Sequence, residues 1–151
     1  MFTRKNNQLT PKCRSLFVSE DREGSYRNKE TMVYICSPYS GDVRRNIEAA
    51  RRYCRFAVEA GYIPFAPHLF FPQFMDDHIL EERDLALSFG ESFMDECSEV
   101  WVFGNHISPG MSEELESAIR KRLTIRFFPS DCLKEYRNAQ SNLPIKKGVL
   151  T

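Results

Sequence analysis

Four short apolar runs, each bounded by turn residues, set the pattern of this chain. They are MVYIC at 32–36, YIPFAP at 62–67, EVWVF at 99–103 and LTIRFF at 123–128. Runs of this length that are rich in β-branched and aromatic residues are typical of buried strands. The prolines of the second run indicate irregular hydrogen bonding there. The sequence therefore predicts four strands, of which 99–103 is the clearest.

Helical periodicity fills the intervals between these runs. After the first run, apolar side chains recur at steps of three and four residues from Val43 to Val58, and arginines occupy other positions. Asp42 or Ser40 is placed to cap this helix, and Gly61 is placed to end it.

Two more helices are expected further along the chain. One covers 79–97, where Gly90 lowers the helix propensity, and the other covers 111–122. Residues 68–77 are rich in aromatic side chains and are expected to form a loop, as are residues 104–110.

The alternation of strands and helices predicts an α/β fold, a three-layer Rossmann or flavodoxin-like sandwich with a mostly parallel sheet. Ligands in such sheets bind beyond the carboxyl ends of the strands, where the strand order reverses. Three segments that follow predicted strands, 37–45, 66–78 and 104–114, are therefore expected to line one pocket.

The length of 151 residues fits one domain, and 42% hydrophobic residues suffice for a core. We expect a flexible N-terminal arm at 1–30, the folded domain at 31–130 and a polar tail at 131–151. The sequence also predicts a short helix at 130–138.

Charge and cysteine content narrow the class of protein. Lys+Arg and Asp+Glu are 21 each, so nothing favours non-specific binding to nucleic acid or membranes. There is no apolar run of membrane-spanning length, so no transmembrane helix is expected, and no secretory signal is expected at the N-terminus. Five widely spaced cysteines without a Cys-x-x-Cys motif argue against a disulfide framework and favour the cytoplasm.

Two loops carry candidate chemistry. Ser37–Gly41, with Tyr39 and Ser40, precedes a helix whose N–H groups could hold an anion, although a plain connecting turn is the better interpretation of this stretch alone. Ser108–Glu114 offers an anion site and a carboxylate together; the alternative is a solvated helix start capped by Ser112, with acidic residues placed favourably in the helix dipole.

Histidines are less informative. His68 follows the second strand, and it either lines the pocket or sits in a turn. Asp76, Asp77 and His78 lack a further ligand at characteristic spacing, so a solvated loop is favoured over a metal site.

Four motifs in order carry a family resemblance: YICSPYSG, GYIPFAPHLFF, SEVWVFG and ISPGMSEELESA. Together they resemble the nucleoside 2-deoxyribosyltransferase-like superfamily over about residues 32–128. More narrowly, they resemble an uncharacterised branch that is common in phages and bacteria. They are also similar to the 2′-deoxynucleoside 5′-phosphate N-hydrolases.

This resemblance implies cleavage or transfer at the N-glycosidic bond of a (deoxy)nucleoside or its 5′-monophosphate, without a metal or organic cofactor. It implies that Glu114 is the nucleophile and that Ser108 contacts the 5′-phosphate. The candidate substrate-binding residues are Ser37, Tyr39, Ser40, Gly41, His68, Ser108, Gly110 and Met111.

Two positions depart from the family pattern. The aspartate that assists the leaving base falls at Glu91 here, and Asp84 and Asp95 are further candidates for this role. Glu113 adds a second charge beside Glu114. The alternatives to an enzyme are a module that binds a nucleotide or nucleotide-derived signal and, more weakly, a partner-binding protein that uses the charged arm. Superfamily members self-associate, so a homodimer or higher homo-oligomer is expected.

Overall fold

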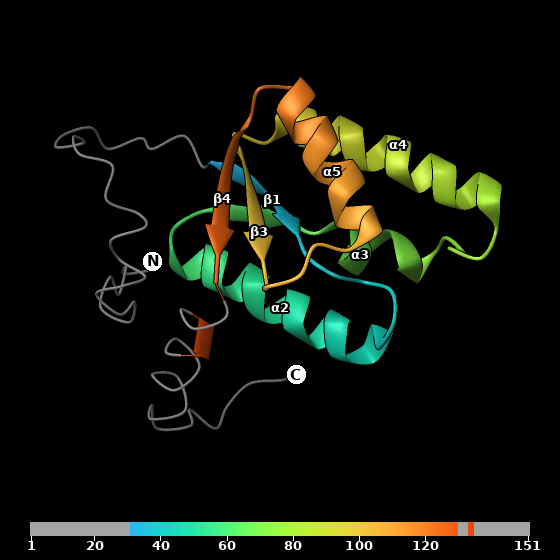
Figure 1. Cartoon of the computed structure of the whole chain (residues 1–151), viewed down its shortest axis with the longest axis horizontal. Coiled ribbons are helices and arrows are strands. Elements are labelled where there is room, and N and C mark those ends of the chain that lie inside the picture. Colours follow the sequence, from blue (N-terminus) through green and yellow to red (C-terminus); the bar gives the residue numbers. More distant parts are fainter. Residues whose placement is uncertain (1–30, 130–132, 135–151) are drawn as a thin grey trace, which may run out of the picture.

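The computed structural model describes residues 31–129 and 133–134, and these form an α/β fold around one parallel sheet (Figure 1). The strands are β1 (Met32–Cys36), β2 (Ile63–Phe65), β3 (Glu99–Phe103) and β4 (Thr124–Phe128), in the order β2-β1-β3-β4. The order reverses between β1 and β3, and the ligand rule for such sheets points to the carboxyl ends of these two strands.

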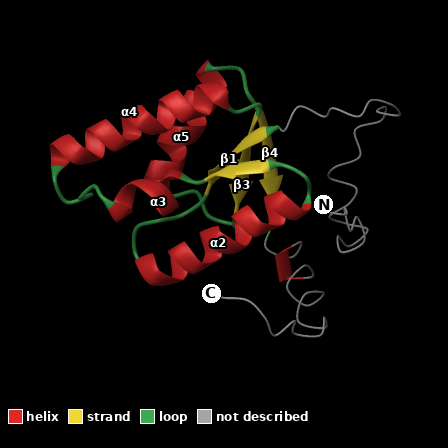
Figure 2. Ribbon diagram, turned by 180° about the vertical axis from the view of Figure 1, so that it is seen from behind, coloured by secondary structure: helices red, strands yellow, loops and turns green. Residues whose placement is uncertain are grey.

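Helices cover both faces of the sheet, so the expected three-layer sandwich is confirmed (Figure 2). α2 (Val43–Glu59) lies on one face, and α4 (Leu80–Glu96) and α5 (Pro109–Arg120) lie on the other. Asp42 caps α2 by accepting the N–H of Arg45 at 3.1 Å, and Gly61 follows its end with a φ of 90°.

The alternation of side chains along β1 divides the core in two. Val33 and Ile35 pack with Phe56 of α2 on one face of the sheet. Tyr34 and Cys36 face the other layer and join a cluster that includes buried residues of α4 and α5. Successive residues at the end of β1 therefore serve opposite sides of the sheet.

The prediction of a loop at 68–77 is wrong for the first half of that segment, which is helical. Residues there form α3 (Pro67–Phe70) and a 3₁₀ turn, η1 (Phe71–Gln73). A proline stands in the first turn of each, where its fixed φ favours a helical start and its missing N–H is not needed. Phe71 is buried and makes edge contacts with Phe65 and Phe93, which ties this segment to β2 and α4.

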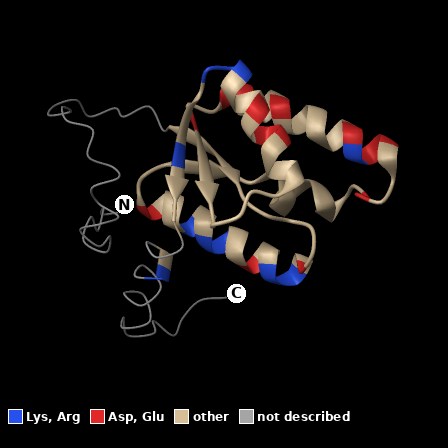
Figure 3. Cartoon of the chain, in the orientation of Figure 1, with Lys and Arg blue, Asp and Glu red and all other residues tan. Residues whose placement is uncertain are grey.

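Most of the charged residues in the described part of the chain lie on the helices (Figure 3). On α2, Arg44 pairs with Glu48 at 3.6 Å and Arg55 with Glu59 at 3.0 Å, each one helical turn apart. In the part of the chain that the structure describes, no helix is long and apolar enough to cross a bilayer. The expected arm at 1–30 and nearly all of the tail at 131–151 fall outside the described residues.

Candidate active site

Glu114 is the best-placed carboxylate for chemistry. It lies on α5, which follows the carboxyl end of β3, and it is partly buried. The hydroxyl of Tyr34, on neighbouring β1, donates a hydrogen bond to Glu114 Oε1 at 2.9 Å. Tyr34 itself is only 2% exposed, so this contact links two core elements that are far apart in the sequence.

The start of α5 differs from the expected one. The helix begins at Pro109 rather than 111, because Ser108 is its N-cap and accepts the N–H of Met111 at 3.3 Å. Ser112, the expected cap, lies inside the helix. Glu114 therefore sits beyond the first turn, which holds no acidic residue, and favourable placement in the helix dipole does not explain it.

Burial raises the pKa of Glu114 from 4.5 to about 7. The thiol of Cys36 and the hydroxyl of Tyr34 act against this rise because they donate to the charged form, whereas the negative charge of Glu113 adds to it. Burial, and then the neighbouring Glu114, raise the pKa of Tyr34, so its hydroxyl stays protonated as a donor. Glu114 is thus a carboxylate that gains and loses its proton near neutral pH.

A second pair of polar side chains lies just past the carboxyl end of β1. Ser37 Oγ and His68 Nε2 are 2.9 Å apart, and both residues are buried. Burial lowers the pKa of His68 to about 4, so its imidazole is neutral at pH 7. His68 therefore lines the site as a neutral hydrogen-bonding group at the start of α3.

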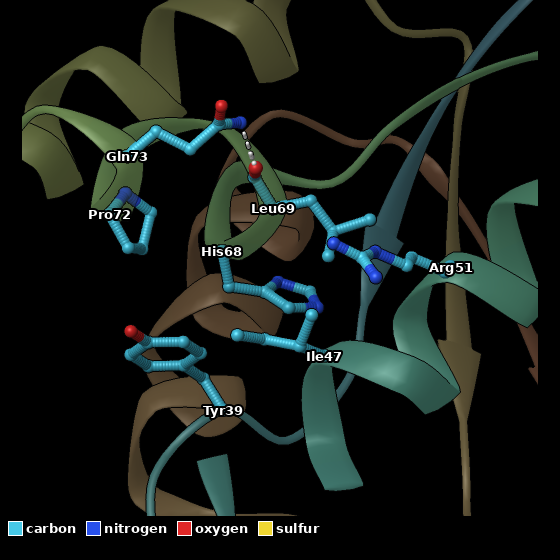
Figure 4. A pocket seen from close by; sticks show the side chains of 7 residues that line it. All are labelled: Tyr39, Ile47, Arg51, His68, Leu69, Pro72 and Gln73. Carbon is cyan, nitrogen blue, oxygen red and sulfur yellow. Dashed lines mark hydrogen bonds between the residues drawn. The ribbon is translucent and has the colours of Figure 1, made fainter. Parts of the chain in front are cut away.

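His68 also borders a pocket of about 410 Å³ between α2 and the α3–η1 segment (Figure 4). Its walls are Tyr39, Ile47, Arg51, His68, Leu69, Pro72 and Gln73. The Arg51 side chain reaches from α2 toward Leu69 (Figure 4), and the Gln73 amide donates to the Leu69 carbonyl at 2.7 Å. The pocket therefore combines apolar and aromatic walls with one guanidinium group.

Glu114 is not part of this pocket wall, because it faces the α4–α5 side of the sheet whereas the pocket opens on the α2 side. Glu114 and the pocket both border the carboxyl end of β1. Cys36 faces Glu114 and Ser37 faces His68, and these two residues are consecutive. A ligand that reaches both groups has to lie across the end of this strand.

The loop after β1 is held by a residue that the sequence did not single out. Asn46 on α2 donates to the carbonyls of Tyr39 and Ser40 at 3.0 and 2.9 Å. Tyr39 is partly buried, with its ring 6.3 Å from that of His68, whereas Ser40 and Gly41 are exposed. Gly41 has a φ of 93°, a conformation that favours glycine.

Of the substrate-binding candidates at the start of α5, Met111 packs against the end of β1, whereas the others lie nearer the surface. The Cys36 sulfur lies 3.9 Å from the carbonyl oxygen of buried Met111, which places the first turn of α5 against β1. Ser108 uses its hydroxyl oxygen in the cap but keeps a proton to donate, and Gly110 is exposed beside it. Open space surrounds Gly110 where a Cβ would lie.

The acidic residues on α4 that were candidates for assisting the leaving base are in ion pairs or exposed. The carboxylate of Glu91 accepts from the Ser117 hydroxyl and pairs with Arg120 at 3.3 Å. Asp95 pairs with Lys121 at 2.5 Å, so both acids bind α4 to the α5 region. Asp84 is exposed near the start of α4. Among the described residues, no cluster of three or more His, Cys, Asp or Glu could hold a metal ion.

Sequence reasoning missed Tyr34, Ile47 and Arg51, whereas Gln73 lies in the segment 66–78 that was expected to line the pocket. Tyr34 stands in an apolar strand, and its phenol was the available signal, since a buried tyrosine hydroxyl needs a partner. Arg51 is one of five arginines on one helix, and nothing in the pattern marks it as facing a pocket.

Comparison with solved structures shows the same fold in two proteins. A 2-deoxyribosyltransferase from Bacillus psychrosaccharolyticus matches with a TM-score of 0.51 and 15% identity, over 66% of this chain and 72% of that one. A 2-deoxyribosyltransferase from Leishmania mexicana matches with a TM-score of 0.50 and 12% identity, over 67% of this chain and 65% of that one. At these identities the likeness concerns the fold.

Sequence comparison gives a family without an assigned activity. No curated protein matches this chain. Residues 31–128 match the model of a domain of unknown function, DUF7768, and the chain belongs to this family.

Proposed function

We propose that this protein cleaves or transfers at the N-glycosidic bond of a (deoxy)nucleoside or nucleoside 5′-monophosphate, with Glu114 as the nucleophile. One observation carries the proposal: a partly buried carboxylate with a pKa near 7, oriented by a tyrosine hydroxyl, lies on the helix that follows a central strand. The sequence motifs and the fold shared with two 2-deoxyribosyltransferases support the substrate class.

In the first step, a Glu114 carboxylate oxygen bonds to the anomeric carbon as the bond from that carbon to the base nitrogen breaks. The base leaves with the bonding electrons and takes a proton. In the second step, water or an acceptor base attacks the anomeric carbon and restores the carboxylate, with loss of a proton from the attacking group. The hydroxyl of Tyr34 orients one carboxylate oxygen throughout.

The substrate lies across the end of β1 in this proposal. The sugar sits over Cys36 and Ser37, within reach of Glu114, and the base enters the pocket beside Tyr39 and His68. Ser108 and Gly110 at the start of α5 provide a phosphate contact. Glu91 and Asp84 stay candidates for protonating the base, and the ion pair of Glu91 with Arg120 weighs against the former.

The experiment is a panel of nucleosides and 5′-monophosphates incubated with purified protein, with free base followed by chromatography. Glu114→Gln keeps the shape of the side chain and removes its nucleophilic charge, so base release should fall about a thousandfold or more. Glu116→Gln, an exposed position on the same helix, is the matched control and should retain the rate.

Binding without turnover is the second candidate function. It is favoured by the engagement of Glu91 with Ser117 and Arg120, which leaves the leaving base without an obvious proton donor. In that case one member of the panel raises the melting temperature and is recovered intact after incubation.

We also propose that the protein forms a homodimer or higher homo-oligomer in the cytoplasm. Several large apolar side chains are exposed around α3 and α4, including Phe70 at 45%, Phe74 at 62%, Leu80 at 72% and Phe89 at 40%. An exposed group of this kind is typical of an interaction surface. The cysteines of the described residues, Cys36, Cys54 and Cys97, are free thiols, as a reducing compartment would keep them.

A further inference from the structure

Gly90 occupies an unfavourable position for a glycine. It lies in the interior of the 17-residue helix α4 and is buried. Glycine is less favourable than alanine in such a position. Its φ is not in the positive range that marks Gly41, Gly61 and Gly104, so backbone conformation does not require it.

The lack of room for a side chain explains why residue 90 is a glycine. A Cβ built on Gly90 would lie 3.3 Å from the hydroxyl oxygen of Tyr34, which is closer than ordinary van der Waals contact. Apart from the backbone of the helix itself and the adjoining residues, the described part of the chain places no other atom within 4 Å of that point. The constraint is therefore the tyrosine oxygen alone and not general crowding between α4 and the sheet.

The same oxygen donates to Glu114 Oε1 at 2.9 Å. α4 cannot easily move aside to admit a larger residue, because Glu91 binds Ser117 and Arg120, and Asp95 binds Lys121. These contacts hold α4 beside α5 at the residue after Gly90 and again one helical turn further on. A methyl group at position 90 would thus push the hydroxyl by a few tenths of an ångström.

We propose that Gly90 is a positioning residue, whose missing side chain leaves the space in which the Tyr34 hydroxyl reaches Glu114. It acts through Tyr34 and contacts no substrate. The inference deepens the function proposed above, since a positioned carboxylate matters most if Glu114 is the nucleophile. Its geometry, however, can be tested without any turnover.

The surroundings of Glu114 define what to measure. Tyr34 and Cys36 on β1 donate to its carboxylate, and Glu113 on its own helix repels it. On α4, Glu91 is paired with Arg120. Displacing the Tyr34 hydroxyl removes a contact that favours the charged form, so Glu114 should hold its proton to higher pH.

The experiment follows the titration of Glu114 by carbon NMR of labelled glutamate side chains in the full chain, with the signal assigned by its loss in Glu114→Gln. Gly90→Ala should raise the titration midpoint by on the order of half a pH unit, and Tyr34→Phe should raise it in the same direction. Ser88→Ala, an exposed change on the same helix, should leave it in place.

The double variant Tyr34→Phe/Gly90→Ala is decisive. Once the hydroxyl is gone, the added methyl group meets nothing, so the midpoint should equal that of Tyr34→Phe alone. An unchanged midpoint in Gly90→Ala, or an equal further rise in the double variant, would overturn the inference. Absence of glycosidase activity would sink the proposed function but leave this result standing, because the titration requires no substrate.

Discussion

The raised pKa of Glu114 predicts that the candidate nucleophile destabilises the folded protein at neutral and alkaline pH. Replacing it with glutamine should therefore make the protein more stable while abolishing its chemistry. Glutamine keeps the size of the side chain and an oxygen that can accept from Tyr34. The substitution removes mainly the charge that burial disfavours.

The magnitude and its pH window follow from the two pKa values. Below pH 4.5 the carboxyl group is protonated in both the folded and the unfolded state, so its ionisation does not affect the free energy of unfolding. As the pH rises from 4.5 to about 7, the unfolded chain loses the proton while the folded chain retains it, so stability falls. Above this window the charge costs up to about 3 kcal/mol, at about 1.4 kcal/mol per pH unit.

The assay is urea unfolding of both proteins at several pH values between 4 and 8. The advantage of Glu114→Gln in free energy of unfolding should be near zero at the lowest pH and about 1–3 kcal/mol at the highest. Glu116→Gln replaces an exposed carboxylate on the same helix, so its difference from wild type in free energy of unfolding should not change with pH. A flat difference for Glu114→Gln as well would refute the reasoning, because Glu114 would then titrate as an ordinary surface acid.

Three further outcomes are expected. Tyr34→Phe should slow base release and move its pH dependence upward, because Glu114 loses a donor that favours its charged form; pH–rate profiles identical to wild type would contradict this. Arg51→Met should weaken nucleotide binding about tenfold in calorimetry, because the pocket loses its guanidinium, whereas Arg52→Met, a neighbour outside the pocket wall, should not; equal effects would remove Arg51 from the site. Leu80→Glu should reduce the mass measured by sedimentation if the exposed apolar side chains around α4 form the oligomer contact; an unchanged oligomer would place the contact elsewhere.

The fold could be predicted because local and global signals agree. The apolar runs are short, rich in β-branched and aromatic residues and separated by amphipathic helices, so the predicted strands and the layer order match the structure. EVWVF coincides with β3 at both ends because polar residues and glycine bound it. α3 and η1 were missed because closely spaced prolines and phenylalanines carry no helical period, and their packing against β2 and α4 decides the outcome.

The candidate site could be predicted only in part. The positions of Glu114 and His68 after strands could be predicted and match the structure, whereas their roles stay predictions. The partner of Glu114 could not be predicted from the sequence. Tyr34 lies 80 residues away, and only the parallel pairing of β1 with β3 brings the two together. The same holds for Arg51 of α2, which lines one pocket together with Gln73 of η1.

Base release from nucleosides and 5′-monophosphates by the wild-type protein, Glu114→Gln and Glu116→Gln tests the central claim most directly. The account predicts free base from at least one substrate with the wild-type and Glu116→Gln proteins, and almost none with Glu114→Gln. Release that survives in Glu114→Gln would contradict the assignment of the nucleophile. No release from any substrate by the wild-type protein, with one of them bound and recovered intact, would contradict the enzyme and favour the binding module.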